Sequence, residues 1–137
     1  MFPNRLQTSP QKMIPSRYRV FDVPIYKAKV TRVVDGDTID VDIDLGFDLT
    51  LKQRLRLYGI NTPEIRSRDP IEKASGLKSK KFLANELKKS DNVIDIKVHG
   101  TGKFGRPLVE IYIGSLNINQ LLIENGYAVP YFGGKKV

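Results

Sequence analysis

The sequence predicts an α+β fold made mainly of β-structure: a small five-stranded barrel with one inserted helix and a short helix near the C-terminus. Three observations lead to this prediction. Short segments with apolar residues at alternate positions recur between residues 30 and 113, as is typical of half-buried strands. One longer stretch, residues 71–89, spaces its apolar residues as a helix does. The length of 137 residues suits a single domain with its own core.

The alternation places the five strands at residues 30–34, 39–45, 49–58, 93–98 and 108–113. In the second strand, apolar residues alternate with Asp40, Asp42 and Asp44, which predicts one buried and one solvated face. These aspartates could be read as a cation site, but a solvated face is the favoured interpretation. The third strand ends before Asn61 to Glu64, because the residue preceding a proline avoids helical geometry.

The first helix is expected at residues 71–89, with Pro70 near its first turn. Its apolar face would be formed by Ala74, Leu77, Leu83, Ala84 and Leu87. A second helix, residues 117–125, is followed by Gly126, the residue type expected just past a helix end. Five short strands combined with these two helices are typical of a closed barrel of the OB type.

The N-terminal residues 1–24 show neither the helical nor the strand spacing of apolar residues, and they carry four prolines among polar and basic residues. They predict an extended basic arm, and residues 25–137 then form the barrel domain. No apolar run approaches the ~20 residues that a membrane span requires, and residues 1–25 lack the apolar segment of a secretory signal. We therefore expect no membrane partner and a cytoplasmic protein, in the host cell if the chain is virally encoded.

Composition narrows the possible chemistry. The chain has 23 Lys and Arg residues against 15 Asp and Glu residues, a net charge of +8, which favours nucleic-acid partners, although solubility alone is the alternative. It has no cysteine, which excludes disulfides, thiolate metal sites and cysteine nucleophiles. The single histidine, His99, excludes a His-paired metal site within one chain, and we expect it to be an exposed bystander.

Four charged residues stand where charge is costly or where catalytic groups gather. Asp37 lies on the apolar side of its strand, which favours a paired or metal-bound carboxylate, unless it accepts backbone N–H bonds in a turn. Arg56 lies between two leucines, where its planar guanidinium group could bind a phosphate or form an ion pair with a carboxylate. Glu64 follows a strand end. Arg106 lies in a glycine turn and could equally be an ordinary loop residue.

The order of these residues along the chain is the stronger signal. The segments Val33-Val-Asp-Gly-Asp-Thr38, Arg56-Leu-Tyr-Gly-Ile-Asn-Thr-Pro-Glu64 and Lys103-Phe-Gly-Arg106 together resemble the staphylococcal nuclease (thermonuclease) family. The downstream segment 119–128 also resembles the short helix of that family and its exit. The resemblance covers about residues 25–132.

The resemblance implies an SNase-like OB-fold nuclease that requires calcium. Such an enzyme hydrolyses phosphodiester bonds in DNA and RNA without sugar preference, by endonucleolytic cleavage, and leaves 3′-phosphate and 5′-hydroxyl ends. It further implies residue roles. Calcium ligands would be Asp37, the residue at position 61 and the backbone carbonyl of Thr62; Glu64 would activate the attacking water; Arg56 and Arg106 would hold the phosphate; Lys103 and Phe104 would flank the nucleotide.

Two departures from the family pattern modify these expectations. Asn61 stands where the family usually has an aspartate ligand, so we expect weaker metal binding and a tolerance for Mg²⁺ or Mn²⁺. Relatives commonly continue into a further helix after the segment that ends this chain. Barrel surface would then be exposed unless residues 1–24 or another chain cover it, and we hypothesise a homodimer.

Two other functions compete with the nuclease. OB barrels also bind single-stranded nucleic acid without cutting it, through basic grooves and stacking aromatic residues, and Asn61 favours such a binding module. A protein-interaction scaffold is the weakest alternative, because a fold alone does not fix function.

Overall fold

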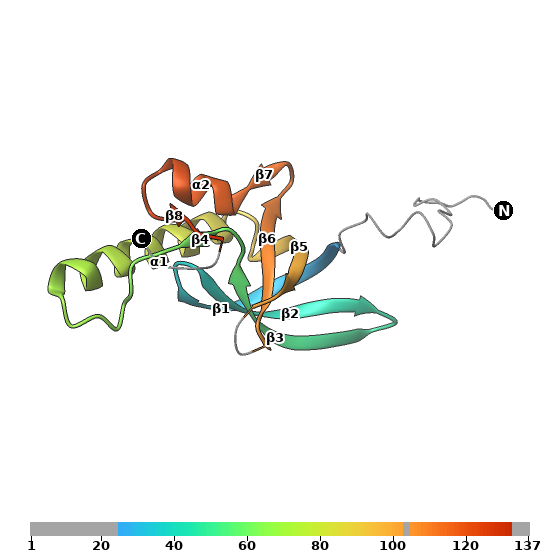
Figure 1. Cartoon of the computed structure of the whole chain (residues 1–137). Helices are drawn as coiled ribbons and strands as arrows, with labels where there is room; N and C mark the ends of the chain where they lie inside the picture. Colours follow the sequence, from blue (N-terminus) through green and yellow to red (C-terminus); the bar gives the residue numbers. More distant parts are fainter. Residues whose placement is uncertain (1–24, 103–104, 133–137) are drawn as a thin grey trace.

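The computed structural model describes residues 25–102 and 105–132 (Figure 1). The main elements follow one another as β1 (Ile25–Asp35), β2 (Thr38–Gly46), β3 (Leu49–Leu57), α1 (Pro70–Lys88), β5 (Val93–Thr101), β6 (Pro107–Ile113) and α2 (Ile118–Glu124). Three strands of two residues each complete the fold: β4 (Ile60–Asn61), β7 (Leu116–Asn117) and β8 (Val129–Pro130). The predicted arm, residues 1–24, lies outside the described residues, as do the predicted substrate-binding residues Lys103 and Phe104.

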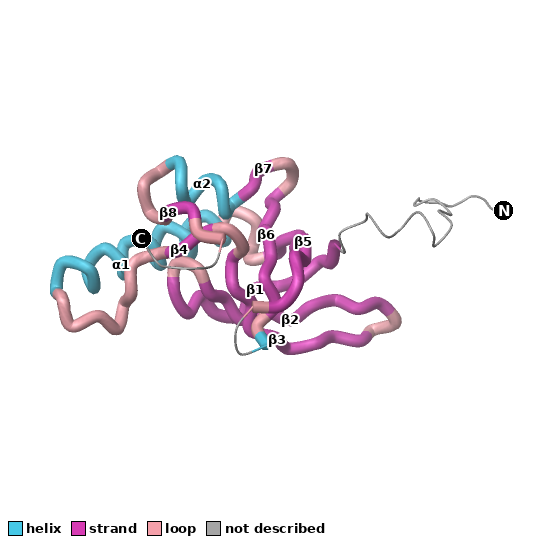
Figure 2. The backbone as a smooth tube through the Cα atoms, viewed as in Figure 1, coloured by secondary structure: helices cyan, strands magenta, loops and turns pink. Residues whose placement is uncertain are grey.

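The five long strands form a closed barrel, as predicted. Antiparallel pairing joins β3 to β2, β2 to β1, β1 to β5 and β5 to β6. The barrel closes where β3 runs parallel to β6, with Arg56 opposite Leu108 and Leu57 opposite Val109. Figure 2 shows both helices on one side of the strands, while the β2–β3 hairpin projects on the other side. The mainly β, α+β fold predicted from the sequence is thus confirmed.

The alternation of β2 produces the two faces predicted for it. Three of its apolar residues, Ile39, Val41 and Ile43, lie in the core, at most 7% exposed, whereas Leu45 near the end of the strand is 45% exposed. On the outer face Asp40 accepts hydrogen bonds from the Arg54 guanidinium at 2.8 and 3.1 Å, and this contact lowers the pKa of Asp40. The three aspartates of this strand therefore form a solvated, partly ion-paired face rather than a cation site.

Helix α1 begins and ends within one residue of the predicted bounds. Asp69 caps its N-terminus by accepting a hydrogen bond from the backbone N–H of Ile71 at 3.0 Å. The predicted apolar face was only half correct, because Ala74 and Leu77 are exposed. Leu83 and Leu87 are buried as predicted, and Gly76 and Ser79 are buried beside them. Small residues occupy two of these positions because backbone and side chains of the barrel end pack directly against the helix there.

The short pairing of β4 with β8 brings two distant segments together, with Ile60 opposite Pro130 and Asn61 opposite Val129. Neither of these two-residue strands was expected from the sequence pattern. The chain after α2 thereby lies beside the chain that leaves β3, close to the residues singled out above. In the part of the chain that the structure describes, neither helix has the length and apolar character needed to cross a membrane.

Candidate active site

Asp37 occupies the turn between β1 and β2 and is almost fully buried, with 7% of its side chain exposed. One carboxylate oxygen accepts hydrogen bonds from the backbone N–H of Thr62 at 3.1 Å and lies 2.9 Å from Arg56 Nη1. The other accepts a hydrogen bond from the Thr38 hydroxyl at 3.1 Å. The carboxylate is therefore paired, as its costly position required, and it joins the β1–β2 turn to a segment 25 residues further on.

Arg56 lies at the end of β3, next to the seam where the barrel closes. Besides its ion pair with Asp37, its Nη2 donates to the Asn61 side-chain oxygen at 3.1 Å and to the Ile60 carbonyl at 3.3 Å. The guanidinium carbon lies 6.0 Å from the centre of the Tyr131 ring. A quarter of the side chain remains exposed. The guanidinium is thus held by three neighbours but still reaches solvent.

The segment after β4 carries the other predicted residues. Asn61 and Thr62 are buried, at 8% and 3% exposure, while Glu64 is exposed at the surface. The backbone of this segment is fixed by the Thr62 hydrogen bond to Asp37 and by a hydrogen bond from the Glu64 N–H to Glu72 Oε2 at 3.2 Å. A buried, polar segment therefore leads directly to an exposed carboxylate.

Arg106 precedes β6 and is half-buried. Arg106 lies two residues before Leu108, the residue that pairs with Arg56. Its positive charge contributes to the lowered pKa of Asp40, so it lies within electrostatic reach of the outer barrel face. The structure therefore brings Asp37 into contact with Arg56 and Thr62, and Arg56 into contact with Asn61. Arg106 is placed only within electrostatic reach of Asp40.

Asp35, a further acidic residue at this end of the barrel, was not among the predicted site residues. Burial raises the pKa of Asp35, and the negative charges of Asp37 and Glu64 raise it further. The positive charges of Arg66 and Lys80 act in the opposite direction. The only signal in the sequence was the Asp-Gly-Asp spacing. Three carboxylates thus share one region in which additional positive charge would be favourable.

The candidate metal ligands are all oxygen donors, the type that Ca²⁺ and Mg²⁺ prefer. Within residues 25–102 and 105–132, no three His, Cys, Asp or Glu side chains are grouped so as to hold a metal ion. The side-chain oxygen of Asn61 and one oxygen of Asp37 already contact Arg56. The pKa of Asp35 is raised mainly by burial and, to a smaller extent, by the negative charges of Asp37 and Glu64. The candidate ligands are therefore of the chemical type that binds a divalent cation, but only Asp37 among them carries a charge.

His99 is not the exposed bystander that the sequence predicted. Its side chain is 21% exposed, and its Nε2 lies 2.5 Å from Glu110 Oε1. Its ring stacks on that of Tyr58, with 4.1 Å between the centroids and 2° between the planes. Burial disfavours the charged Glu110 carboxylate, but hydrogen bonds from His99 and Asn117, together with nearby positive charges, hold its pKa below the usual value. Partners on neighbouring strands, which the local pattern does not reveal, cause this burial.

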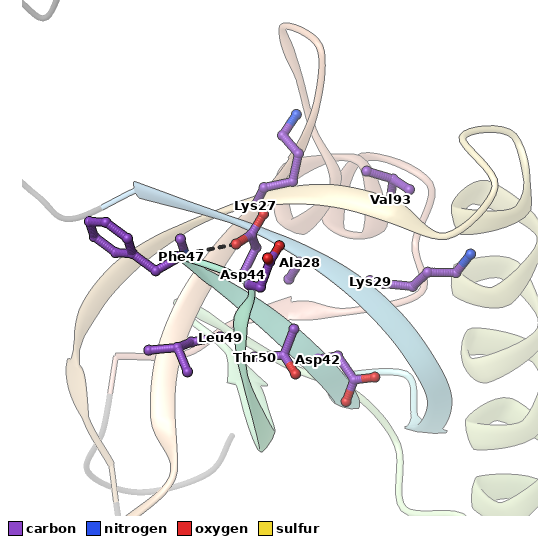
Figure 3. A pocket seen from close by; sticks show the side chains of 11 residues that line it. Lys27, Ala28, Lys29, Asp42, Asp44, Phe47, Leu49, Thr50 and Val93 are labelled. Atoms are coloured by element: carbon purple, nitrogen blue, oxygen red, sulfur yellow. Dashed lines mark hydrogen bonds between the residues drawn. The ribbon is translucent and has the colours of Figure 1, made fainter.

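A large surface pocket lies away from all these residues, between β1 and the tip of the β2–β3 hairpin (Figure 3). Its volume is about 620 Å³, and both lysines and aspartates line it. At the tip, Phe47 is 98% exposed and has a φ of 52°, a left-handed conformation that is costly for an aromatic residue. This pocket contains none of the predicted site residues.

Comparisons with known proteins support the resemblance. The model of the family described as "Staphylococcal nuclease homologue" matches residues 54–136. A thermonuclease of Staphylococcus intermedius is 35% identical over 107 residues, which cover 75% of this chain and 58% of the relative. An uncharacterized protein of Methanocaldococcus jannaschii is 34% identical over 128 residues (77% and 59%). Endonuclease YhcR of Bacillus subtilis is 32% identical over 115 residues (78% and 9%). The chain thus spans little more than half the length of the first two relatives.

Proposed function

The chain belongs to the staphylococcal nuclease homologue family, and we propose that it is a metal-dependent nuclease that hydrolyses DNA and RNA without sugar preference. The observation that carries the proposal is the contact of a partly exposed Arg56 with Asp37 and Asn61, beside a segment that presents Glu64 to solvent. A guanidinium, oxygen donors for a cation and an accessible carboxylate are what phosphodiester hydrolysis requires.

In the proposed reaction Arg56 and Arg106 bind the phosphate and stabilise the negative charge that gathers on its oxygens. Glu64 accepts a proton from the attacking water, whose oxygen bonds to phosphorus. The bond between phosphorus and the 5′ oxygen breaks, leaving a 3′-phosphate and a 5′-hydroxyl that takes its proton from solvent. Cleavage is proposed to be endonucleolytic. Lys103 and Phe104 would flank the nucleotide, a role that stays a prediction.

Asp37, Asn61 and the carbonyl of Thr62 would hold the metal, which we propose to be Ca²⁺. A bound divalent cation would supply positive charge beside the phosphate. Because Asn61 contributes no charge and already accepts a hydrogen bond from Arg56, the proposed site binds calcium weakly and tolerates Mg²⁺ or Mn²⁺.

The second candidate function is a nucleic-acid-binding module without catalysis. Two observations favour it: the neutral Asn61, and the lack of a ready-made cluster of three acidic or histidine ligands in the described ranges. Its net charge of +8 would support binding to the phosphate backbone in either case.

Cleavage assays separate the two functions. Single-stranded DNA, duplex DNA, RNA and a closed circular DNA are incubated with the chain in Ca²⁺, Mg²⁺, Mn²⁺ or chelator, and the product ends are mapped. The nuclease proposal expects calcium-stimulated cutting of all four substrates, the circle included, with 3′-phosphate ends. Salt-dependent binding without cutting in any metal would overturn it in favour of the binding module.

The predicted homodimer is kept as a proposal, supported by the hairpin surface. The exposed apolar residues there are Leu45, Phe47, Leu49 and Leu51. The adjoining pocket carries both Lys27 and Asp44 (Figure 3), so the same surface on a second copy would offer complementary charges under two-fold symmetry. Light scattering should give twice the monomer mass, and Phe47→Ser should lower it; a monomer at high concentration would refute the dimer. A cytoplasmic location stays a prediction that cell fractionation would test.

A further inference from the structure

Glu72, in the first turn of α1, reaches back to the loop that carries Glu64. Its Oε2 accepts a hydrogen bond from the Glu64 backbone N–H at 3.2 Å, and its Oε1 accepts one from the Ser67 hydroxyl at 2.8 Å. The Ser67 hydroxyl oxygen in turn accepts a hydrogen bond from the Asp69 N–H at 3.1 Å. One half-buried carboxylate therefore fixes both ends of a short loop.

Gly76, one helical turn further along α1, packs directly against the backbone of the same loop. A Cβ at this position would lie 2.7 Å from the Pro63 carbonyl oxygen, 3.0 Å from the Ile65 nitrogen and 3.1 Å from the Glu64 carbonyl carbon. These are backbone atoms, which cannot move aside as a flexible side chain would. The backbone of Glu64 is thus held by a hydrogen bond on its nitrogen and by direct packing against α1.

The position of this backbone sets the point from which the exposed Glu64 side chain extends. A general base must lie within hydrogen-bond reach of the water it activates. A displacement of about 1 Å at such a group can cost about 100-fold in rate. Control of the loop by α1 would therefore be expressed in turnover more than in substrate binding.

We propose that Glu72 is a positioning residue, which holds the Glu64 backbone on α1 so that the Glu64 carboxylate meets the attacking water. This inference rests on the proposed function, in which Glu64 is the base. An alternative explanation is purely structural, since an acidic side chain in the first turn of a helix also interacts favourably with the helix dipole. The test must therefore separate position from stability.

The experiment compares wild type with Glu72→Ala, Glu72→Gln and Gly76→Ala, under conditions in which unfolding curves show each variant to be folded. Glu86→Gln is the matched control, because it removes the same charge from the last turns of α1 and leaves the loop untouched. We expect Glu72→Ala to lower kcat about 10- to 100-fold with KM within about twofold of wild type. Glu72→Gln, whose amide can still bond both partners, should stay within about threefold of wild type. Gly76→Ala should lower kcat although it changes no charge.

Hydrogen exchange of the Glu64 amide gives a readout that is independent of activity. The amide should be protected in wild type, in Glu72→Gln and in Glu86→Gln, and should exchange at least about tenfold faster in Glu72→Ala. A folded Glu72→Ala variant with wild-type kcat would overturn this inference while leaving the nuclease intact. A wild-type chain that cuts nothing would instead overturn the proposed function. The contact between Glu72 and the Glu64 backbone would then have no catalytic role.

Discussion

Replacement of Asn119 by alanine should be among the most destabilising single changes in this chain. The side chain is 4% exposed and makes three hydrogen bonds. Its oxygen accepts from the Ile111 N–H at 3.0 Å, and its amide donates to the carbonyls of Tyr58 at 2.9 Å and Val109 at 3.0 Å. It thereby connects α2 to both strands at the seam where the barrel closes.

The expected loss follows from these three bonds. Each contributes about 0.5–1.5 kcal/mol, and a buried N–H left without a partner costs about 1–3 kcal/mol, so we expect a loss of about 3–5 kcal/mol in the free energy of unfolding. Urea unfolding followed by circular dichroism should show a midpoint roughly 2 M lower at an unchanged slope.

Two variants test the reasoning behind this value. Asn119→Leu fills the space but restores no hydrogen bond, so it should remain strongly destabilised. Asn125→Ala removes an exposed bond to the Leu121 carbonyl on the same helix and should cost less than about 1 kcal/mol. The account of the seam would be refuted if Asn119→Leu were as stable as wild type, or if Asn119→Ala cost no more than Asn125→Ala.

Three further predictions concern packing, pH and metal binding. A Cβ added at Gly36 would lie 2.7 Å from Ser79 Cβ, so Gly36→Ala should cost about 1–3 kcal/mol. Ser79→Gly should recover part of that loss in a double-mutant cycle of urea midpoints, whereas simple additivity would contradict the contact. The pKa of Glu110 is lowered in the fold, so its stabilisation is complete above its unfolded value of about 4.3 and is lost as pH falls through the lower folded value. Glu110→Gln should therefore destabilise the chain at pH 7 and much less near pH 2.5 in unfolding curves; an equal cost at both would speak against an ionised Glu110–His99 contact. Asn61→Asp adds a carboxylate to the proposed ligands and should lower the calcium concentration for half-maximal cleavage by about tenfold; an unchanged or higher value would remove Asn61 from the metal site.

The strands were predictable because their chemistry is local. Alternation in β2 identifies Ile39, Val41 and Ile43 as core residues, although Leu45 at the end of the strand is exposed, and Pro70 marks the start of α1. Strands β4 and β8 were missed, since two residues are too few to show a period. The burial of Gly76 and Ser79 was missed because a small residue at a close contact has no hydrophobic signature.

The candidate site was predictable to a different extent. The order of Asp37, Arg56 and Glu64 along the chain resembles that of the staphylococcal nuclease family, and the roles proposed for them come from that resemblance. The structure brings the first two into contact. Glu72 gave no signal, because an acid in the first turn of a helix is common there for other reasons. Its contact with the Glu64 N–H depends on how the intervening loop folds, and the packing of that loop is a tertiary property.

The proposed role of Glu64 is tested by the cleavage rate of duplex DNA by wild type and by Glu64→Ala, each measured in calcium and in chelator. If the chain is a calcium-dependent nuclease with Glu64 as its base, wild type cleaves in calcium and chelator abolishes the cleavage. The rate for Glu64→Ala should be about 10²- to 10⁴-fold lower, as the loss of a general base requires. Equal rates for the two proteins would contradict the assignment of Glu64, and no cleavage by wild type in any metal would contradict the nuclease itself.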